Sequence, residues 1–384
     1  MLKKQFISII QQLRTKAFGW KSQYEIDVPE SLKFMNRIKE PVNDIERSYS
    51  QYCCQCYLMS KMAVFLYNLS AFFLIIPYIF KCCFGTVKER NNVDIVYTIS
   101  IKDKSIIPAS LHEKYTTERV TDLYEGFKIN KFDLRFIVKL WIQHPFSFFF
   151  IHRIIFKISI YRYFIEKYNP KAIAINAEYS STSSVMTMYC ELQGIDHINI
   201  MHGEKLLNIR DSFFRFTKCY VWDEYYVELF KKLRAKDGQF VIERPASLIF
   251  DVEAHKGEIP HSDYKYMLFL NNKLDQIRLI ITQLQKKGYK VMVRPHPSYT
   301  DMNRLRAFFN EDEIEDTRIS VQASVANTDN VISLVSTVLL QAYFSGVNVV
   351  IDDVAYQEEY NKLNDLGYIL LNRNHILLSE VVAE

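Results

Sequence analysis

Residues 290–297 read K-V-M-V-R-P-H-P, a short apolar run that is stopped by a proline, a histidine and a second proline. This pattern predicts a buried β-strand over Val291–Arg294 that ends in a stiff loop. The two prolines restrict the backbone on both sides of His296. Since ligands of open α/β sheets bind at the carboxyl ends of strands, the stretch predicts an imidazole at a ligand-binding edge. The plainer interpretation of His296 is an ordinary turn histidine.

A second motif follows about forty residues later, where Asp329 begins the stretch D-N-V-I-S-L-V-S-T-V-L-L-Q-A. It predicts a strand over Asn330–Ser333 and then a helix that starts at Thr337. Ser336 and Thr337 suit the N-cap position, where free backbone N–H groups and the helix dipole attract a phosphate. We expect the two strands to be neighbours, so that the imidazole and the helix N-terminus together hold a nucleotide phosphate.

Short apolar strands alternate with helices in two sets, which predicts an α/β protein with two parallel sheets. We expect a helical segment over residues 1–90, Rossmann-like domains over 91–250 and 264–372, and a tail over 373–384. The second set includes expected strands near 318–322 and 368–371. Neither half contains a Walker loop or a G-x-G-x-x-G motif, which disfavours P-loop and dinucleotide-binding proteins.

Composition narrows the choice of partners. The 384 residues include 48 Lys and Arg against 44 Asp and Glu, and no basic stripe predicts nucleic-acid binding. Lys and Arg exceed Asp and Glu within residues 1–90, which favours an anionic membrane surface. The seven cysteines are odd in number, and C-C-Q-C at residues 53–56 lacks the spacing of a zinc site. We therefore expect reduced cytosolic thiols.

Met62–Phe80 carries no charged residue and is flanked by Lys61 and Lys81. Its length leaves three interpretations open: a transmembrane helix, a helix lying on a membrane, or a buried helix. Residues 132–168 mix aromatic with basic side chains, which suits a headgroup interface or ordinary packing against a sheet. The N-terminus begins like a signal peptide, but its apolar run is broken and no A-x-A site follows, so we do not expect export.

Two sheet domains, with R-P-H-P at Arg294–Pro297, S-x-x-S-T at Ser333–Thr337 and H-G-E at His202–Glu204, resemble the GT-B glycosyltransferases. More narrowly, these motifs resemble bacterial enzymes that use cytidine-nucleotide donors. That group contains sialyltransferases and polysialyltransferases, capsule Kdo transferases and glycerol-phosphate transferases. The resemblance implies two Rossmann-like parallel-sheet domains that face a cleft, with an acceptor in the first and a nucleotide sugar in the second.

The resemblance also implies a donor site in the second domain. Its expected residues are Arg294, His296, Pro297, Ser333, Ser336, Thr337 and Gln341. His296 and the helix N-terminus would stabilise the leaving phosphate, since an imidazole donates hydrogen bonds near neutral pH. Two members have structural alternatives: Arg294 would bind a phosphate or sugar carboxylate, or pair with an acidic residue. Gln341 would bond the ribose or face a neighbouring helix.

A carboxylate at a strand end of the first domain is the expected base for the acceptor hydroxyl. Glu178 fits best, because it follows the predicted strand Lys171–Asn176; Glu204 and Glu125 are the rivals. Glu178 has a structural alternative too, as a carboxylate favoured at a helix N-terminus. His202 and Gly203 are possible contacts to donor or acceptor. Because no D-x-D motif is present, we expect catalysis without a metal, and by direct displacement with inversion.

These residues lead to one preferred function and three alternatives. We expect transfer of sialic acid from CMP-sialic acid to a lipid-linked or surface-polysaccharide acceptor, such as O-antigen, lipopolysaccharide or capsule. The enzyme would be peripheral on the cytoplasmic face of a bacterial inner membrane. The alternatives are transfer from CMP-Kdo or another nucleotide sugar, a UDP-sugar 2-epimerase, and a non-catalytic, membrane-associated assembly protein.

Overall fold

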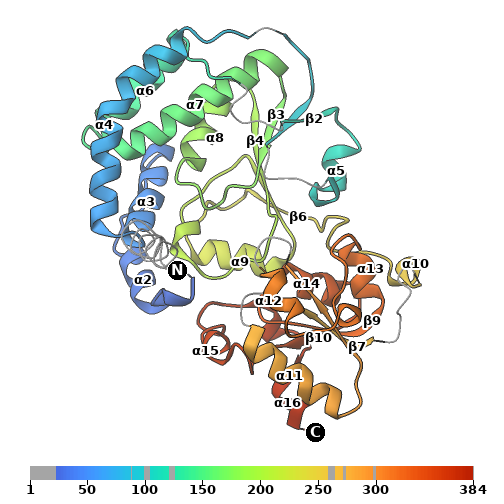
Figure 1. The fold of residues 1–384 in the computed structure, drawn as a ribbon. Coiled ribbons are helices and arrows are strands. Elements are labelled where there is room, and N and C mark those ends of the chain that lie inside the picture. The colour runs from blue at the N-terminus through green and yellow to red at the C-terminus, as the bar shows by residue number, and fades with distance from the viewer. Residues whose placement is uncertain are drawn as a thin grey trace. The chain divides into compact units, whose positions relative to one another are not determined.

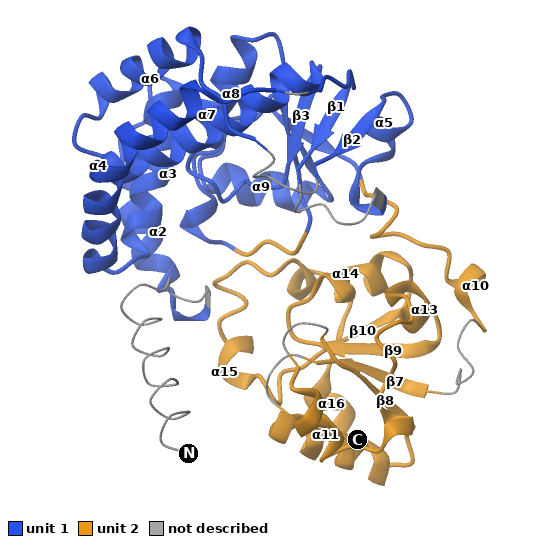
Figure 2. Ribbon diagram, turned by 45° about the horizontal axis from the view of Figure 1, so that its top comes forward, with its two compact units in different colours: residues 1–202, 207–243 blue, residues 203–206, 244–384 orange. Residues whose placement is uncertain are grey.

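The computed structural model describes residues 23–87, 89–98, 104–120, 126–257, 264–270, 274–296 and 300–383. Two of the expected site residues, Glu125 and Pro297, lie outside these ranges. The chain divides into two compact units, coloured separately in Figure 2. Unit 1 comprises Met1–His202 and Leu207–Glu243, and unit 2 comprises Gly203–Leu206 and Arg244–Glu384.

Unit 1 is built on a parallel sheet of six strands in the order β2-β1-β3-β4-β5-β6. The central strands are buried, which explains their continuous apolar runs. The expected strand over Lys171–Asn176 is present as β3, and β6 lies at the edge of the sheet. The strands are β1 (Ile95–Tyr97), β2 (Thr117–Arg119), β3 (Ala172–Ile175), β4 (Asp196–Ile200), β5 (Lys218–Val221) and β6 (Phe240–Ile242).

Helices cover the sheet of unit 1 in two layers. Helices α7 and α8 lie against the sheet, and α4 and α6 lie outside them, as Figure 1 shows. The helical elements are η1 (Gln23–Glu25), α2 (Val28–Asn36), α3 (Asp44–Tyr57), α4 (Lys61–Cys83), η2 (Lys104–Ile106), α5 (Ala109–His112), α6 (Lys131–Gln143), α7 (Phe148–Tyr168), α8 (Ser183–Glu191), η3 (Ile209–Asp211) and α9 (Glu224–Lys232).

The described N-terminal helices belong to unit 1, whereas the sequence predicted a segment of their own for residues 1–90. Helix α3 packs against α8. Its Ser48 Oγ accepts a hydrogen bond from the backbone N–H of Val185 at 2.9 Å. Arg47 donates to the carbonyl oxygen of Arg234 at 3.0 Å. Polar side chains of α3 therefore form hydrogen bonds with the sheet-and-helix core of unit 1.

Unit 2 contains a parallel sheet of five strands in the order β11-β10-β9-β7-β8. Two parallel sheets flanked by helices confirm the expected α/β class with two Rossmann-like units. The strands are β7 (Tyr264–Phe269), β8 (Val291–Arg294), β9 (Thr328–Ser333), β10 (Asn348–Ile351) and β11 (Ile376–Leu377).

Two expected strands of unit 2 are wrong. The predicted strand near 318–322 is instead a turn that leads into helix α13 (Val321–Ala326), which Ser320 caps by accepting from the Ala323 N–H. The predicted strand at 368–371 is instead the 3₁₀ helix η5 (Ile369–Asn372). Within the expected tail, β11 pairs with β10 and α16 (Leu378–Ala383) follows it. The remaining elements are α10 (Val252–His255), α11 (Leu274–Lys286), α12 (Met302–Arg306), η4 (Glu311–Glu313), α14 (Thr337–Phe344) and α15 (Gln357–Tyr360).

Candidate functional site

His296 lies just beyond the carboxyl end of β8, as the sequence predicted. All four residues of the strand are buried, and Pro295 interrupts the backbone donors. The His296 N–H donates to Thr300 Oγ1 at 2.8 Å, and the Thr300 N–H donates to the His296 carbonyl at 3.2 Å. These two bonds join His296 to Thr300, and His296 is half-buried just beyond the end of β8.

Arg294 does not have a phosphate-binding geometry. Its guanidinium donates to the Glu315 carboxylate, to Ser324 Oγ at 2.6 Å and to the Ile319 carbonyl at 2.8 Å. Both members of the ion pair are buried. These bonds direct the guanidinium donors into unit 2. The structure therefore supports pairing of Arg294 with an acidic residue over binding of a phosphate or sugar carboxylate. We remove Arg294 from the donor-binding set.

The helix N-terminus expected after β9 is present. Ser336 is the N-cap of α14, and its Oγ accepts from the Val338 N–H at 3.3 Å. Thr337 is the first helical residue, and both side chains are half-buried. Ser333, the last residue of β9, donates to the Phe269 carbonyl at 3.3 Å and so acts within the sheet. The Val338 N–H and the Leu339 N–H both donate to Ser336, so the attraction of this terminus for an anion comes mainly from the helix dipole.

The two motifs share one edge of the sheet but are not on neighbouring strands, so that expectation is wrong. The register pairs Phe269 of β7 with Arg294 of β8, and β7 also pairs with β9 through Leu268 and Ile332. Because β7 lies between them, the strand ends are about 10 Å apart, or two strand spacings. The backbones at the two strand ends are therefore separated by one strand, and side chains from both ends would meet only at a ligand that lies over β7.

Gln341 is occupied by a structural contact. Its Nε2 donates to the Ser247 carbonyl at 2.6 Å, which ties α14 to the segment that enters unit 2. A ribose contact from this side chain would require that bond to break. The structure therefore supports the structural interpretation of Gln341.

The H-G-E turn is adjacent to the α14 N-terminus. Gly203 belongs to unit 2, and a Cβ built on it would lie 3.8 Å from Thr337 Oγ1. His202 and Glu204 on either side of Gly203 are half-buried. Of the predicted residues, Gly203 and Thr337 are therefore brought together, and Glu204 follows within the same short turn.

Glu178 follows β3 but is fully buried, with 0% of its surface exposed. Its Oε2 accepts from Asn199 Nδ2 of β4 at 3.2 Å, and Asn199 Oδ1 accepts from the Ala177 N–H at 2.8 Å. The Glu178 carbonyl accepts from Gln51 Nε2 at 2.7 Å. An acceptor hydroxyl needs access to its base, so this burial favours the half-buried Glu204 over Glu178.

Two residues around this turn were missed from the sequence. Gln51 and Gln55 are one helical turn apart on α3, and Gln55 Nε2 donates to the Tyr179 carbonyl at 2.7 Å. Gln55 Oε1 also accepts from Arg153 of α7 at 2.8 Å. The i, i+4 spacing of two glutamines on an otherwise amphipathic helix was the available signal. It could not reveal that their partners lie more than a hundred residues away.

Two pockets in unit 2 lie at opposite ends of its strands. The larger, about 610 Å³, is lined by His296, Thr300, Arg306 and Arg318 among others. Its arginines are paired with carboxylates, Arg306 with Glu311 at 2.8 Å and Arg318 with Asp316. The pocket is large enough for a small ligand, and its arginines are engaged with carboxylates of the same unit.

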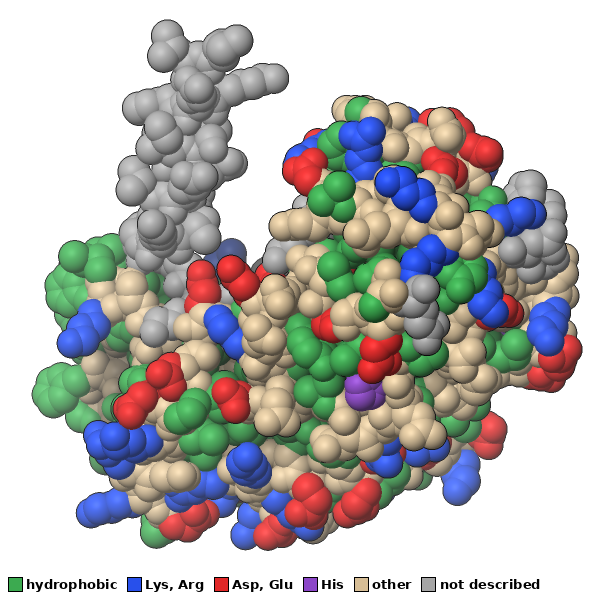
Figure 3. Space-filling model, turned by 90° about the horizontal axis from the view of Figure 1, so that it is seen from below, with side chains coloured by type: hydrophobic (Ala, Val, Ile, Leu, Met, Phe, Trp, Pro, Cys, Tyr) green, Lys and Arg blue, Asp and Glu red, His purple; other side chains and the backbone are tan. Residues whose placement is uncertain are grey.

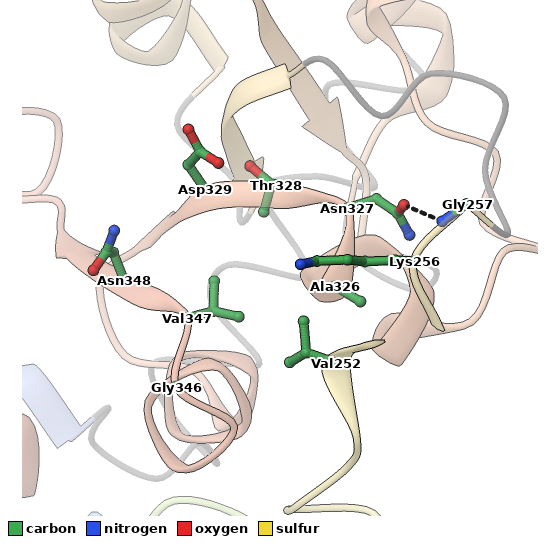
Figure 4. Close-up of a pocket in the computed structure, with 10 residues that line it drawn as sticks. All are labelled: Val252, Lys256, Gly257, Ala326, Asn327, Thr328, Asp329, Gly346, Val347 and Asn348. Atoms are coloured by element: carbon green, nitrogen blue, oxygen red, sulfur yellow. Dashed lines mark hydrogen bonds between the residues drawn. The ribbon is translucent and has the colours of Figure 1, made fainter. Parts of the chain in front are cut away.

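The other pocket, about 440 Å³, lies at the amino ends of β9 and β10. Figure 4 shows Thr328 and Asn348, the first residues of these strands, with the Lys256 side chain at the opposite side. Asn327 Oδ1 accepts from the Gly257 N–H at 2.9 Å, which joins two of the lining segments. Because ligands of parallel sheets bind at the carboxyl ends, we place the site at the His296 edge instead.

Within the described ranges, no group of three or more His, Cys, Asp or Glu side chains could hold a metal ion. The adjacent acids after β10 serve the backbone: Asp352 accepts from the Ala355 N–H and Asp353 accepts from the Ser379 N–H, both at 2.8 Å. Metal-independent catalysis remains an expectation.

No known family profile matches the chain, and no curated protein matches it in sequence. Solved structures with some likeness include the wall teichoic acid polymerase TagF, at 10% identity over 84% of this chain and 88% of that chain, with a TM-score of 0.45. A UDP-GlcNAc 2-epimerase from Methanocaldococcus jannaschii has 12% identity over 73% and 93%, with a TM-score of 0.40. The glycotransferase of kitacinnamycin has 9% identity over 77% and 92%, with a TM-score of 0.44. Likeness at this level carries no argument about function.

Proposed function

We propose that the chain is a GT-B glycosyltransferase that moves a sugar from a cytidine-nucleotide donor to an oligosaccharide acceptor. One observation carries the proposal: His296 and the Ser336-capped N-terminus of α14 project from the same carboxyl edge of the unit 2 sheet. An imidazole donor and the positive end of a helix dipole at one edge are suited to stabilise the charge on a departing phosphate.

The separation of the two motifs divides their roles. The α14 N-terminus, with Thr337, would bind the oxygen atoms of the phosphate. His296 would donate a hydrogen bond to the phosphate or to the sugar from the other side of β7. A donor that carries both a phosphate and a sugar offers separate groups to the two strand ends, which are about 10 Å apart because β7 lies between them. CMP-sialic acid is our first choice and CMP-Kdo our second.

A carboxylate would accept the proton of the acceptor hydroxyl. We place Glu204 first because it is half-buried and neighbours Gly203, which lies against Thr337. Glu178 is the second choice, with its carboxylate held by Asn199. A base opposite the leaving group gives direct displacement, so the proposal includes inversion at the anomeric carbon and needs no metal.

The acceptor in this proposal is lipid-linked, and the enzyme is peripheral on the cytoplasmic face of an inner membrane. A second candidate is a UDP-sugar 2-epimerase, which would use the same edge of the sheet for a nucleotide phosphate. Incubation with UDP-N-acetylhexosamine and no acceptor separates the two. Epimer formation in that reaction contradicts sugar transfer.

The direct test is a transfer assay with CMP-sialic acid or CMP-Kdo and a membrane extract as acceptor, with proton NMR of the product anomer. We expect transfer with inversion that is insensitive to EDTA. Glu204→Gln should abolish turnover while nucleotide binding persists. Glu178→Gln should retain turnover. Loss in Glu178→Gln alone would reverse the assignment of the base, and unchanged activity in His296→Ala would refute the site.

A further inference from the structure

Helix α4 presents its large apolar side chains to solvent and its small ones to the protein. Its buried residues are Ala63, Ala71, Ile75 and Cys82, which form one stripe along the helix. The opposite side carries Phe65, Phe72, Phe73, Ile76 and Phe80, each between 52% and 67% exposed. A helix that faces water normally has the reverse arrangement, so the exposed side indicates an apolar partner.

The exposed surface continues from α4 onto α6. Phe148, the first residue of α7, lies between them: its ring centroid is 5.0 Å from that of Phe72 and 6.3 Å from that of Trp141. Beyond Trp141, Ile142 and Phe146 are 74% and 85% exposed. We call Phe65, Phe72, Phe73, Ile76, Phe80 and Phe146 the α4 face. In Figure 3, hydrophobic side chains protrude at the left-hand edge, the side on which Figure 1 places α4.

The exposed charged side chains of α4 and α6 are all cationic. Residues 61–87 contain no Asp or Glu, and Lys61 and Lys81 at the ends of the helix are exposed. On α6, the exposed cations Lys131, Arg135 and Lys139 lie on the same side as Ile142. The one acid of α6, Asp133, is buried and paired with Arg162 at 2.8 Å. An apolar surface on two helices whose exposed charges are all cations complements an anionic lipid bilayer.

Contacts between α4 and α7 decide how such a bilayer would be met. Tyr78 Oη and Ser159 Oγ are 2.7 Å apart, and the Phe149 N–H donates to Asn68 Oδ1 at 3.2 Å. One bond lies in each half of α4, and the buried residues Ala71 and Ile75 lie between them along the helix. A helix that crossed the bilayer would have to give up this packing, although by length and composition alone α4 is a candidate span. The packed arrangement suits a helix lying in the plane of the interface.

We propose that the α4 face docks unit 1 onto an anionic bilayer, with α4 in the membrane plane and the cations of α6 on lipid headgroups. This inference supplies the surface for the membrane contact included in the proposed function. It does not depend on the donor chemistry, because every residue that carries it belongs to unit 1. Failure of vesicle binding would leave nucleotide binding at His296 intact, so the two proposals fail separately.

The test is flotation of the full chain with phosphatidylcholine vesicles, with or without one third phosphatidylglycerol. Three variants are compared with wild type: Phe72→Ser/Phe73→Ser/Ile76→Ser, Lys131→Glu/Arg135→Glu/Lys139→Glu, and Leu279→Ser. Leu279 is a matched control because it is 68% exposed on α11 of unit 2. Circular dichroism verifies that each variant is folded.

We expect wild type and Leu279→Ser to float with phosphatidylglycerol vesicles, and each triple variant to bind at least tenfold more weakly. High salt should weaken wild-type binding. Alkaline carbonate should release the protein from native membranes. Unchanged flotation of the aromatic variant would overturn the proposal. So would retention after carbonate, which indicates a spanning helix. If wild type does not bind vesicles but forms an oligomer, and the aromatic variant is a monomer, the α4 face would instead belong to an interface with a second copy of the chain.

Discussion

Replacing Arg294 with methionine separates a structural arginine from a phosphate-binding one. The change removes a buried ion pair with Glu315 and the hydrogen bonds to Ser324 and Ile319. Removing one partner of a buried pair costs about 3–5 kcal/mol, because the other charge stays buried without compensation. For a unit of this size each kcal/mol lowers Tm by about 2–4 °C, so the Tm of unit 2 should fall by roughly 6–20 °C.

Urea unfolding of Arg294→Met, Glu315→Gln and the double variant measures this directly. Each single variant should be strongly destabilised, and the double variant should lose less than the sum of the two. Arg304→Met is the control, since Arg304 pairs with Asp275 on the surface at 2.5 Å and should cost less than about 1 kcal/mol. Native stability of Arg294→Met combined with loss of nucleotide binding would refute the structural assignment.

Three further changes test unit 1. Burial lowers the pKa of His197 to about 3 from 6.5, so the unfolded state binds the proton first as the pH falls. The free energy of unfolding should therefore decrease as the pH drops from about 6.5 towards 3. In urea unfolding at a series of pH values, His197→Gln should remove most of this decrease. Burial and the neighbouring Arg153 lower the pKa of Lys157 to about 8 from 10.5. Because the folded state loses this proton first, the free energy of unfolding should rise from about pH 8 to 10.5. Lys157→Met should raise Tm at pH 7 and remove that rise. Gly85→Ala places a Cβ 1.9 Å from the Phe127 carbonyl oxygen, so it should cost about 1–3 kcal/mol in urea unfolding, and a wild-type Tm would contradict this contact.

Local patterns were enough to predict the elements that carry the site. The apolar run before Pro295 gave strand β8, and the hydroxyl pair after Ser333 gave the N-cap of α14. Both depend on residues within a few positions of each other, where steric limits and capping bonds act. The α/β class followed from the alternation of such elements.

Properties set by distant residues were not predictable. The partner of Arg294 is Glu315, which lies in a loop after η4, and nothing near R-P-H-P points to it. The order of strands places β7 between β8 and β9, and alternation along the chain does not determine that order. Burial of Glu178 depends on Gln51 and Asn199, which come from other elements of unit 1.

Calorimetric titration of CMP and CDP into three proteins tests the central claim, that the His296 edge of unit 2 holds the donor phosphate. The proteins are wild type, His296→Ala and His375→Ala. His375 is a matched control, since it is half-buried in the same unit and precedes β11 at the amino end of that strand. We predict binding to wild type and His375→Ala, with at least tenfold weaker binding to His296→Ala. Equal affinity in all three proteins, or binding of UDP or GDP alone, would contradict the account.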